Sequence, residues 1–311
     1  DFAETVKMTK LIDLCDIQYG YAFDSNCFSK DNSYPQLARI RDVKRGYSET
    51  FYTGKYPKEY VLSAGDLLIG MDGEFNVARW KIDGALLNQR VCKVVAKNGT
   101  NEEYIRFFLL KQLKTIEEKT SFVTVKHLSA REINKIEVDI PKLCEQEKIA
   151  TTLLMLERIE ELRNRELLLL DELVRGRFVE LFGHPENNEM NWPQYCFGDI
   201  CTVRQGLQIP ISKRLTETEE NCYEYITVAY LHGGKEREYI KDPKDSVICH
   251  EDDILMTRTG NTGMVVTDVE GVFHNNFFLI DFDRNRFSKG FLVEYLNLDY
   301  IQADILRRAG T

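Results

Sequence analysis

Apolar and polar positions alternate along the chain in two patterns, and each pattern predicts a different element. Short apolar runs bounded by Gly, Pro or polar turns predict buried strands. They occur at "QLARIRDV" (36–43), "GDLLIG" (65–70), "RVCKVVA" (90–96), "EYITVAYL" (224–231) and "FFLIDF" (277–282). Apolar residues spaced three and four positions apart predict helices over 102–119 and 289–308, each following a strand.

The longest helical pattern runs from Glu145 to Phe182, a stretch with no Pro and a single Gly, Gly176. At 1.5 Å per residue such a helix would be roughly 57 Å long, beginning after Pro141 and ending at Gly183. Its apolar stripe favours a rigid spacer that pairs with a second long helix over a connecting helix packed on one neighbour. The expected interface with the partner helix consists of Ile149, Leu153, Leu156, Leu162, Leu167, Leu170, Val174 and Phe178.

The chain carries the same series of patterns twice. "GDLLIGMDG" (65–73) returns as "DDILMTRTG" (252–260), and at the same offset of 187 positions "LLNQRV" matches "FHNNFF". A constant offset over many positions indicates an internal duplication. The sequence therefore predicts an α+β protein with two similar mixed α/β domains, over 1–142 and 184–311, the second incomplete at its C-terminus. The long helix, over 143–183, would join them.

Composition narrows the class of protein. With 311 residues the chain is long enough for two domains, each with its own core. No run of 18 apolar residues occurs, so we expect no membrane span, and the N-terminus lacks the apolar core of a signal peptide. The eight cysteines lie singly, without a CxxC pair, which is typical of reduced thiols in a cytoplasmic protein.

Motifs of self-contained enzymes are missing from the sequence. It has no GxGxxG opening a helix after a strand, no Walker GxxxxGKS or GxxxxGKT, no HExxH, no GxSxG and no paired-cysteine metal motif. "EVDIPK" (137–142) is interpreted as a strand that leads into a helix rather than as a nuclease motif. We therefore expect no catalytic residue, no metal ligand and no bound cofactor in this chain.

Polar side chains suited to DNA gather in corresponding loops of the two copies. Arg suits guanine, and Asn or Gln suits adenine, because each can make bidentate contacts in the major groove. The candidates are Arg39, Arg41, Lys44, Arg45, Asn88, Gln89, Arg90, Gln205, Gln208, Lys213, Arg214, Arg258, Asn261, Asn275 and Asn276. The net charge of −9 is unusual for a nucleic-acid binder, so a partner would have to supply part of the attraction to phosphate.

The order of the motifs carries a family resemblance. Each copy opens with an entry segment, "LIDLCDIQYG" or "FGDICTVRQG", and continues through "AGDLLIGMDG" or "EDDILMTRTG". The first copy also holds "LARIRDVKRG", "LLNQRV" and "TVKHLSAREINKIEVDIPKLCEQEKIA", which leads into the long helix. Over nearly its whole length the chain resembles the specificity subunit of type I restriction–modification systems. The resemblance implies a non-catalytic subunit whose two target recognition domains each read one half of a split DNA sequence.

The same resemblance implies partners and further site residues. Double-stranded DNA would be the ligand, the helix would set the spacing of the half-sites, and two methyltransferase (M) subunits would dock on the helices, joined by restriction (R) subunits. S-adenosylmethionine, ATP and Mg would belong to those partner subunits. Matched by position, the resemblance adds to the DNA-binding candidates Gln36, Asp72, Glu74, Asn76 and Tyr230.

The chain departs from the family pattern at two places. Lys126 replaces the usual Pro, and the second copy ends at "RRAGT" where the first continues "SFVTVKHLS". We therefore expect the second long helix to be missing. Either the chain is a shortened form of the family pattern, or another chain, which includes a second copy, supplies the helix that pairs with the apolar stripe. The alternatives are a protein-binding scaffold whose basic loops are merely solvated, and a recognition fragment of a fused restriction–methylation enzyme.

Overall fold

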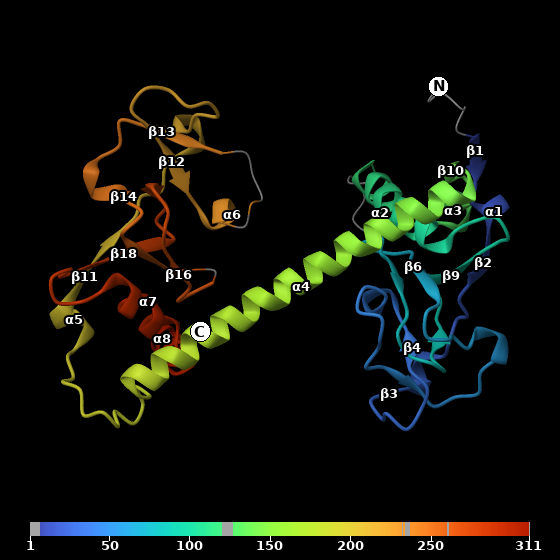
Figure 1. The fold of residues 1–311 in the computed structure, drawn as a ribbon, viewed down its shortest axis with the longest axis horizontal. Helices are drawn as coiled ribbons and strands as arrows, with labels where there is room; N and C mark the ends of the chain where they lie inside the picture. The colour runs from blue at the N-terminus through green and yellow to red at the C-terminus, as the bar shows by residue number, and fades with distance from the viewer. Residues whose placement is uncertain (1–6, 120–126, 232, 234–236, 260, 311) are drawn as a thin grey trace. The chain divides into compact units, whose positions relative to one another are not determined.

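The computed structural model describes residues 7–119, 127–231, 233, 237–259 and 261–310. Lys126 and Gly260, which belong to the motifs above, lie outside the described residues. The chain divides into two units, residues 1–164 and 165–311, and the division falls inside one long helix, α4 (Leu143–Phe182). Both units combine helices with mixed strand pairings, which confirms the α+β class with two domains joined by a long helix (Figure 1).

Unit 1 is built on an antiparallel sheet of four strands in the order β2-β9-β6-β7. Three short pairs accompany this sheet: β4 with β8 in parallel, β3 with β5, and β1 with β10. The strands are β1 (Lys7–Lys10), β2 (Cys15–Tyr19), β3 (Phe28–Ser29), β4 (Leu37–Ala38), β5 (Phe51–Tyr52), β6 (Leu67–Gly70), β7 (Val77–Arg79), β8 (Leu86–Leu87), β9 (Val91–Ala96) and β10 (Glu137–Ile140). The helices before α4 are α1 (Leu11–Leu14), α2 (Glu102–Lys119) and α3 (Ala130–Ile133).

Strand β6 shows why "GDLLIG" is an unbroken apolar run. Leu67 and Ile69 pack on one face with Ile105 of α2, whereas Leu68 packs on the other face with Trp80. All four residues of the strand are buried, so the alternation of a half-exposed strand is lost. The motif is therefore a core motif, and the DNA-binding candidates lie in the loops that it positions.

Unit 2 has two four-stranded sheets. The first, β11-β18-β15-β16, corresponds to the four-stranded sheet of unit 1, and the second is β13-β12-β17-β14. The strands are β11 (Cys201–Gln205), β12 (Cys222–Ile226), β13 (Tyr239–Lys241), β14 (Ile248–Cys249), β15 (Ile254–Thr257), β16 (Val265–Val266), β17 (Gly271–Phe273) and β18 (Phe277–Phe282). The helices are α5 (Phe197–Ile200), α6 (Val228–Leu231), α7 (Lys289–Asn297) and α8 (Asp299–Ala309). Like β6, β15 is buried on both faces, with Ile254 against Leu292 of α7 and Leu255 on the other side.

Three predicted elements are shorter or interrupted. The strand expected over 36–43 is only β4, because the chain turns into a 3-10 helix that ends at buried Asp42. The strand expected over 224–231 is β12 followed by the short helix α6. The helix expected over 289–308 breaks at Leu298, which is extended and buried, and so becomes α7 and α8.

The two units are equivalent, but the offset between them is not constant. Leu67 pairs with Val94, and Ile254 pairs with Ile280. Strands β6 and β15 are therefore 187 positions apart, whereas β9 and β18 are 186 apart, because the connection between the two strands is one residue shorter in unit 2. The expected match of "LLNQRV" with "FHNNFF" at constant offset is wrong by one residue.

Two glycines mark the same close approach in each unit. A Cβ atom at Gly20 would lie 2.0 Å from Asn88 O, and a Cβ atom at Gly206 would lie 2.3 Å from His274 O. Both distances are far inside van der Waals contact, so only glycine fits there. The pairs also show that Asn88 and His274 are equivalent, in agreement with the offset of 186.

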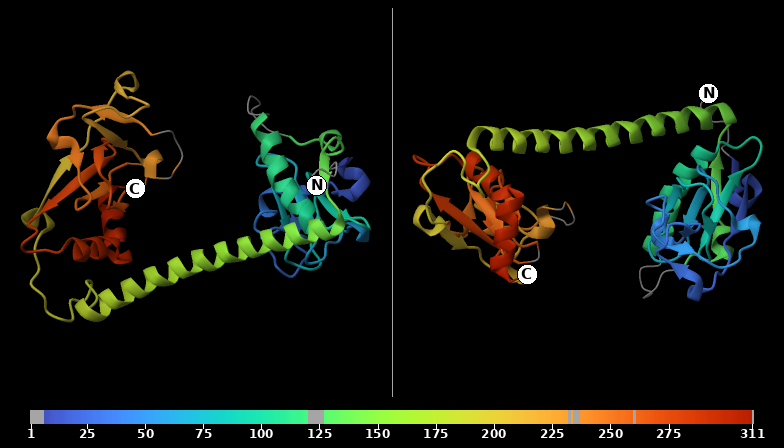
Figure 2. Two further views of the ribbon diagram at one scale, coloured as in Figure 1. Left: turned by 45° about the horizontal axis from the view of Figure 1, so that its top comes forward. Right: turned by 90° about the horizontal axis from the view of Figure 1, so that it is seen from below.

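Helix α4 runs without a break through 40 residues and ends at Phe182, directly before Gly183, whose φ is +75° (Figure 2). Its start is fixed by Gln146, which is 1% exposed. Gln146 Oε1 accepts a hydrogen bond from Asn101 N–H, and its Nε2 donates to Pro141 O, both at 2.8 Å. The "EQ" of the motif thus joins β10, α2 and α4. None of the described helices has an apolar stretch long enough to cross a membrane.

Candidate nucleic-acid interface

The loop after β4 holds a dense group of predicted DNA-binding cations. Arg41 and Lys44 are exposed, with 63% and 71% of their side-chain surface accessible. Arg39 is half-buried, and its guanidinium lies 5.7 Å from the centre of the Phe28 ring. Lys44 Nζ lies 3.3 Å from Glu74 Oε1, another predicted site residue. Arg41 and Lys44 are therefore the cations of this loop that an anionic ligand can reach most easily.

Arg45 and Gln36 hold the same loop in shape. Asp42 is 1% exposed, and its carboxylate accepts hydrogen bonds from Ser48 Oγ at 2.8 Å and from the Arg45 guanidinium. That guanidinium also lies 5.1 Å over the ring of Tyr47. Gln36 Oε1 accepts a hydrogen bond from Ser48 N–H at 2.9 Å. These contacts give both residues a structural task, and their contact with DNA stays a prediction.

The turn between β8 and β9 carries three predicted residues. Asn88 is buried, whereas Gln89 and Arg90 are exposed. Arg90 has a left-handed φ of +69°, which costs free energy in a residue with a side chain. Arg90 Nη1 lies 3.3 Å from Asp72 Oδ1 and 2.9 Å from His127 Nδ1, and Asp72 in turn contacts His127. Three distant segments thus meet at one charged cluster.

Sequence reasoning missed His127 as a site residue. It lies inside the "TVKHLS" passage, and the backbone N–H of the next residue bonds to Met71 O at 2.7 Å, which brings His127 to Asp72. The two cluster residues are 55 positions apart, so their spacing carried no signal. Asn76, which the family resemblance adds to this region, donates to Glu74 O at 3.0 Å.

In unit 2 the matching segments also meet. Arg258 N–H donates to Asn276 O at 2.6 Å, and Thr259 Oγ1 donates to Asn276 Oδ1 at 3.0 Å. Asn275 Nδ2 lies 3.5 Å from Gln208 Oε1. The structure therefore brings four of the predicted residues of this unit into one group: Gln208, Arg258, Asn275 and Asn276.

The other predicted residues of unit 2 differ in their surroundings. Arg214 is mostly buried, because its guanidinium donates to Ile209 O at 3.0 Å and to Glu238 Oε2 at 2.9 Å. The Tyr230 hydroxyl donates to Glu224 Oε2, and this hydrogen bond raises the pKa of Tyr230. The remaining three are exposed: Gln205, Lys213 and Asn261.

His274, the equivalent of Asn88, supports the turn from below. Its Nδ1 accepts a hydrogen bond from Asn276 N–H at 3.1 Å. Burial, with a smaller contribution from the charge of Arg214, lowers the pKa of His274. The ring therefore stays neutral at physiological pH, which keeps Nδ1 available as an acceptor.

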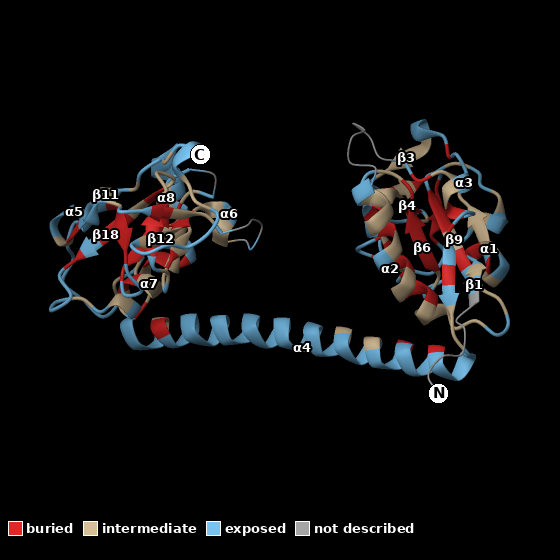
Figure 3. Cartoon of the chain, turned by 90° about the horizontal axis from the view of Figure 1, so that it is seen from above, coloured by how far each residue is buried: buried red, intermediate tan, exposed pale blue. Residues whose placement is uncertain are grey.

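The predicted interface on α4 is open along most of the helix (Figure 3). Exposure between 42% and 61% is found for Ile149, Leu156, Leu162, Leu167, Leu170 and Val174. Leu153 is half-buried. Phe178 departs from the prediction, because it is 6% exposed and packs within unit 2 on Phe291 of α7, with ring centroids 5.2 Å apart.

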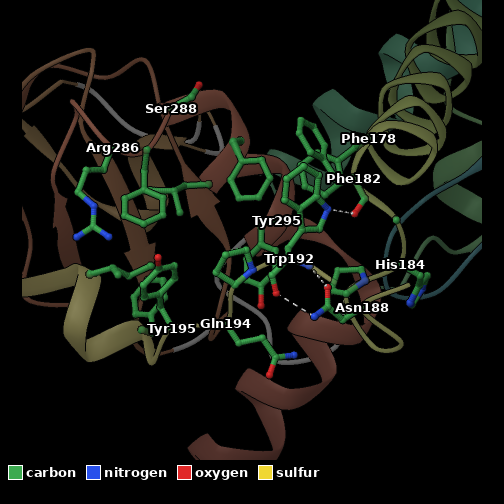
Figure 4. Close-up of a pocket in the computed structure, with 18 residues that line it drawn as sticks. Phe178, Phe182, His184, Asn188, Trp192, Gln194, Tyr195, Arg286, Ser288 and Tyr295 are labelled. Carbon is green, nitrogen blue, oxygen red and sulfur yellow. Dashed lines mark hydrogen bonds between the residues drawn. The ribbon is translucent and has the colours of Figure 1, made fainter. Parts of the chain in front are cut away.

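The turn after α4 borders an aromatic cavity of about 730 Å³ inside unit 2 (Figure 4). Phe182, Trp192 and Tyr295 are among its lining residues. Trp192 Nε1 donates to Phe182 O at 2.9 Å, and Asn188 Nδ2 donates to Trp192 O at 3.0 Å. These bonds tie the turn to the end of α4, a contact that the sequence did not predict.

All eight cysteines are free thiols. Burial raises the pKa of Cys15, Cys92 and Cys249 to about 12. Cys144 and Cys196 are exposed. Within the part of the chain that the structure describes, no group of three or more His, Cys, Asp or Glu side chains could hold a metal ion.

Comparisons with known proteins agree with this architecture. The family model "Type I restriction modification DNA specificity domain" matches residues 3–170, more than half of the chain. The specificity subunit of the type I restriction enzyme EcoBI from Escherichia coli is 41% identical over 141 residues, which are 45% of this chain and 30% of that protein. The crystal structure of the S subunit of a type I restriction–modification system from M. genitalium has a TM-score of 0.58 at 17% identity. That match covers 100% of this chain and 81% of the other, and it shows a shared fold. The chain belongs to the family of type I restriction modification DNA specificity domains.

Proposed function

We propose that this chain is the specificity subunit of a type I restriction–modification enzyme and that each unit reads one half of a bipartite sequence in double-stranded DNA. The chain itself catalyses no reaction in this proposal. Two methyltransferase (M) subunits supply the S-adenosylmethionine chemistry, and restriction (R) subunits supply cleavage that uses ATP and Mg. The observation that carries the proposal is the family match over residues 3–170. The complex works in the cytoplasm, where the DNA is.

The distribution of polar groups supports a reading task for both units. In each unit the loop that follows the buried strand β6 or β15 meets the turn that precedes β9 or β18. Arg and Asn side chains lie at these meeting points, and they are the residue types that make bidentate contacts with base edges. The net charge of −9 gives the chain little attraction of its own for phosphate, so the M subunits provide part of the clamp.

Helix α4 supports the docking of protein partners. Leu156, Leu167 and Leu170 expose 50% or more of their surface on a helix that is otherwise charged. Burial of each leucine contributes roughly 1.5–3 kcal/mol, so an open stripe of this length favours association with another helix. A helix from an M subunit or from a second copy of the chain provides the matching apolar face.

Selection of binding sites from a random pool of duplex DNA tests the proposal. The chain, purified with its M subunits, should select a bipartite sequence with two specified halves and an unspecified gap. The chain alone, given S-adenosylmethionine, ATP and Mg, should neither methylate nor cut DNA. A chain that selects no sequence but still captures its M subunits would favour the protein-binding scaffold instead, and turnover by the isolated chain would contradict the non-catalytic assignment.

The length of α4 provides a second test, because the helix would set the gap between the half-sites. Seven residues inserted after Arg163 add about two turns and roughly 10 Å, and they keep the apolar stripe nearly in phase. With a matching insertion in the partner helix, the selected gap should grow by at most a few base pairs, since DNA rises about 3.4 Å per pair. An unchanged gap with altered half-site letters would show that α4 is only a connector.

A further inference from the structure

The register of the strands makes Arg90 and Asn276 equivalent residues. Arg90 directly precedes β9 and Asn276 directly precedes β18, and these two strands are 186 positions apart. Matching at a constant offset would have set Gln89 against Asn276 instead. The register therefore places two residue types that can contact base edges, an arginine and an asparagine, at the same position of the two units.

In unit 1 this position is held by a backbone bond and a side-chain contact. Met71 N–H donates to Arg90 O at 2.8 Å, and Asp72, the next residue, contacts Arg90 Nη1 at 3.3 Å. His127 Nδ1 lies 2.9 Å from the same Nη1. The Arg90 side chain is 49% exposed, so it is restrained at one nitrogen while its other edge can reach a ligand.

Unit 2 forms the same two contacts with different side chains. Arg258 N–H donates to Asn276 O at 2.6 Å, and Thr259, the next residue, donates its hydroxyl to Asn276 Oδ1 at 3.0 Å. Because β6 and β15 are 187 positions apart, Arg258 and Thr259 are equivalent to Met71 and Asp72. The two units therefore share the backbone hydrogen bond and the position of the side-chain contact, but the side chains that make this contact differ.

In each unit the two side chains in contact have complementary hydrogen-bonding groups. An aspartate carboxylate accepts from a guanidinium, and a threonine hydroxyl donates to an amide oxygen. With Nη1 held by Asp72, the Nε and Nη2 edge of Arg90 is the edge that can contact O6 and N7 of guanine. With one lone pair of Oδ1 taken by Thr259, the Asn276 amide keeps a second lone pair and its NH₂ group for N6 and N7 of adenine.

The place where the residues after β6 or β15 contact the residue before β9 or β18 is called the junction of each unit. We propose that each junction reads one base, so that Arg90 specifies a guanine in one half-site and Asn276 specifies an adenine in the other. Asp72 and His127 are positioning residues for Arg90, and Thr259 is the positioning residue for Asn276. The left-handed backbone of Arg90 agrees with this assignment. Backbone strain in a non-glycine residue persists only where the surrounding structure enforces it, and such residues cluster at functional sites. The inference rests on the proposed DNA-reading function and names the residues that carry it.

An exchange of side chains between the two junctions tests the inference. The double variant Arg90→Asn with Asp72→Thr should replace one guanine by adenine in one selected half-site and leave the other half-site unchanged. The reciprocal variant, Asn276→Arg with Thr259→Asp, should replace one adenine by guanine in the other half-site. Each exchange should shift the preference at that base pair by roughly tenfold or more. Asn tolerates a positive φ better than most residues, so Arg90→Asn adds no backbone strain.

Two control variants carry the same residue changes away from the junctions. Arg131→Asn in α3 and Asn285→Arg after β18 alter exposed residues, and both should select the wild-type sequence. The positioning residues are tested by Asp72→Asn, which should weaken discrimination at the guanine alone, while Asp72→Glu should restore it. Thermal unfolding of every variant separates these effects from loss of the fold.

Two results would overturn the inference while the DNA-reading function stands. Either the exchange variants select the wild-type letters, or they weaken binding to all sequences equally, as a phosphate contact would. A wild-type chain that selects no sequence at all would overturn the proposed function and the inference together.

Discussion

Arg106 and Glu157 form a two-point ion pair in which Nη1 lies 2.9 Å from Oε1 and Nη2 lies 2.7 Å from Oε2. Arg106 belongs to α2 and is 8% exposed, and its Nε is bound by Glu103. The pair therefore fastens the first part of α4 to the body of unit 1. A bidentate contact of this kind fixes direction as well as distance, so α4 cannot turn about its own axis without breaking it.

Removal of Glu157 should loosen this attachment. Glu157→Ala leaves a mostly buried guanidinium with one carboxylate fewer, and it should lower the free energy of unfolding by about 1–2 kcal/mol, because the Glu157 side chain is 40% exposed. Urea unfolding followed by circular dichroism measures the change. Glu160→Ala, an exposed change on the same helix, is the control. Equal losses in the two variants would show that the pair adds nothing.

The two close-approach glycines should be intolerant of any side chain. Gly20→Ala places a methyl group 2.0 Å from a carbonyl oxygen in unit 1, and Gly206→Ala does the same at 2.3 Å in unit 2. Each should cost about 3 kcal/mol or more. Gly176→Ala is the matched control, because a Cβ there meets nothing within 4 Å and alanine favours the helix by up to about 1 kcal/mol. An unchanged free energy of unfolding for Gly20→Ala or Gly206→Ala would contradict the close contact between that glycine and the carbonyl oxygen.

The open stripe of α4 should drive association. Leu156→Asp and Leu170→Asp together should abolish self-association, or capture of an M subunit, and leave both units folded, because these side chains are 55% and 50% exposed. Sedimentation velocity gives the oligomeric state, and Glu160→Ala again serves as the control. A wild-type chain that stays monomeric at high concentration and also fails to capture an M subunit would rule out this interface.

Substitutions of Arg41 and Arg45, which lie in one loop, should have different effects, the first on DNA selection and the second on stability. Arg41→Ala removes an exposed cation and should weaken selection in one half-site about tenfold, with the melting temperature unchanged. Arg45→Ala removes a partner of buried Asp42 and should lower the melting temperature. Arg258→Ala should affect the other half-site. Parallel melting curves and site selection check all three, and a stable Arg45→Ala variant would show that Asp42 does not need Arg45 in addition to Ser48.

The cysteines should divide by reactivity. With a pKa of about 12, Cys15, Cys92 and Cys249 carry almost no thiolate at pH 8, so maleimide should label Cys144 and Cys196 first. These raised pKa values also bear on stability. Above pH 9 the unfolded thiols lose protons that the folded thiols keep, so stability should fall between about pH 9 and pH 12. Rapid labelling of Cys92 in the native protein would contradict its burial.

The sequence predicted the elements well where local pattern decides the outcome. Helix α2 has the predicted bounds, 102–119, because its apolar spacing and its position after a strand are local features. Strands β6 and β18 also lie where the apolar runs place them. The strand over 36–43 failed because buried Asp42 turns the chain, and a buried carboxylate is decided by tertiary partners such as Ser48.

The site was harder to predict because it depends on register. The sequence predicted both Arg90 and Asn276 as site residues but could not show that they are equivalent. The connection from β15 to β18 is one residue shorter than that from β6 to β9, and only the strand register shows this difference. It could not place His127 beside Asp72 either, because only the backbone bond to Met71 brings that segment back. Arg214 looked like a ligand-facing cation until its burial against Glu238 was visible.

The position of the two junctions in separate units has a combinatorial consequence. Each junction lies at the start of an inner strand, β9 or β18, in a unit with its own core, so a substitution at Arg90 removes none of the contacts described for Asn276. Effects at sites without shared partners add independently. Variants of one junction can therefore be combined freely with variants of the other. Under the proposed reading function, the repertoire of DNA targets then grows as the product of the alternatives at the two junctions, while the number of mutations needed grows only as their sum.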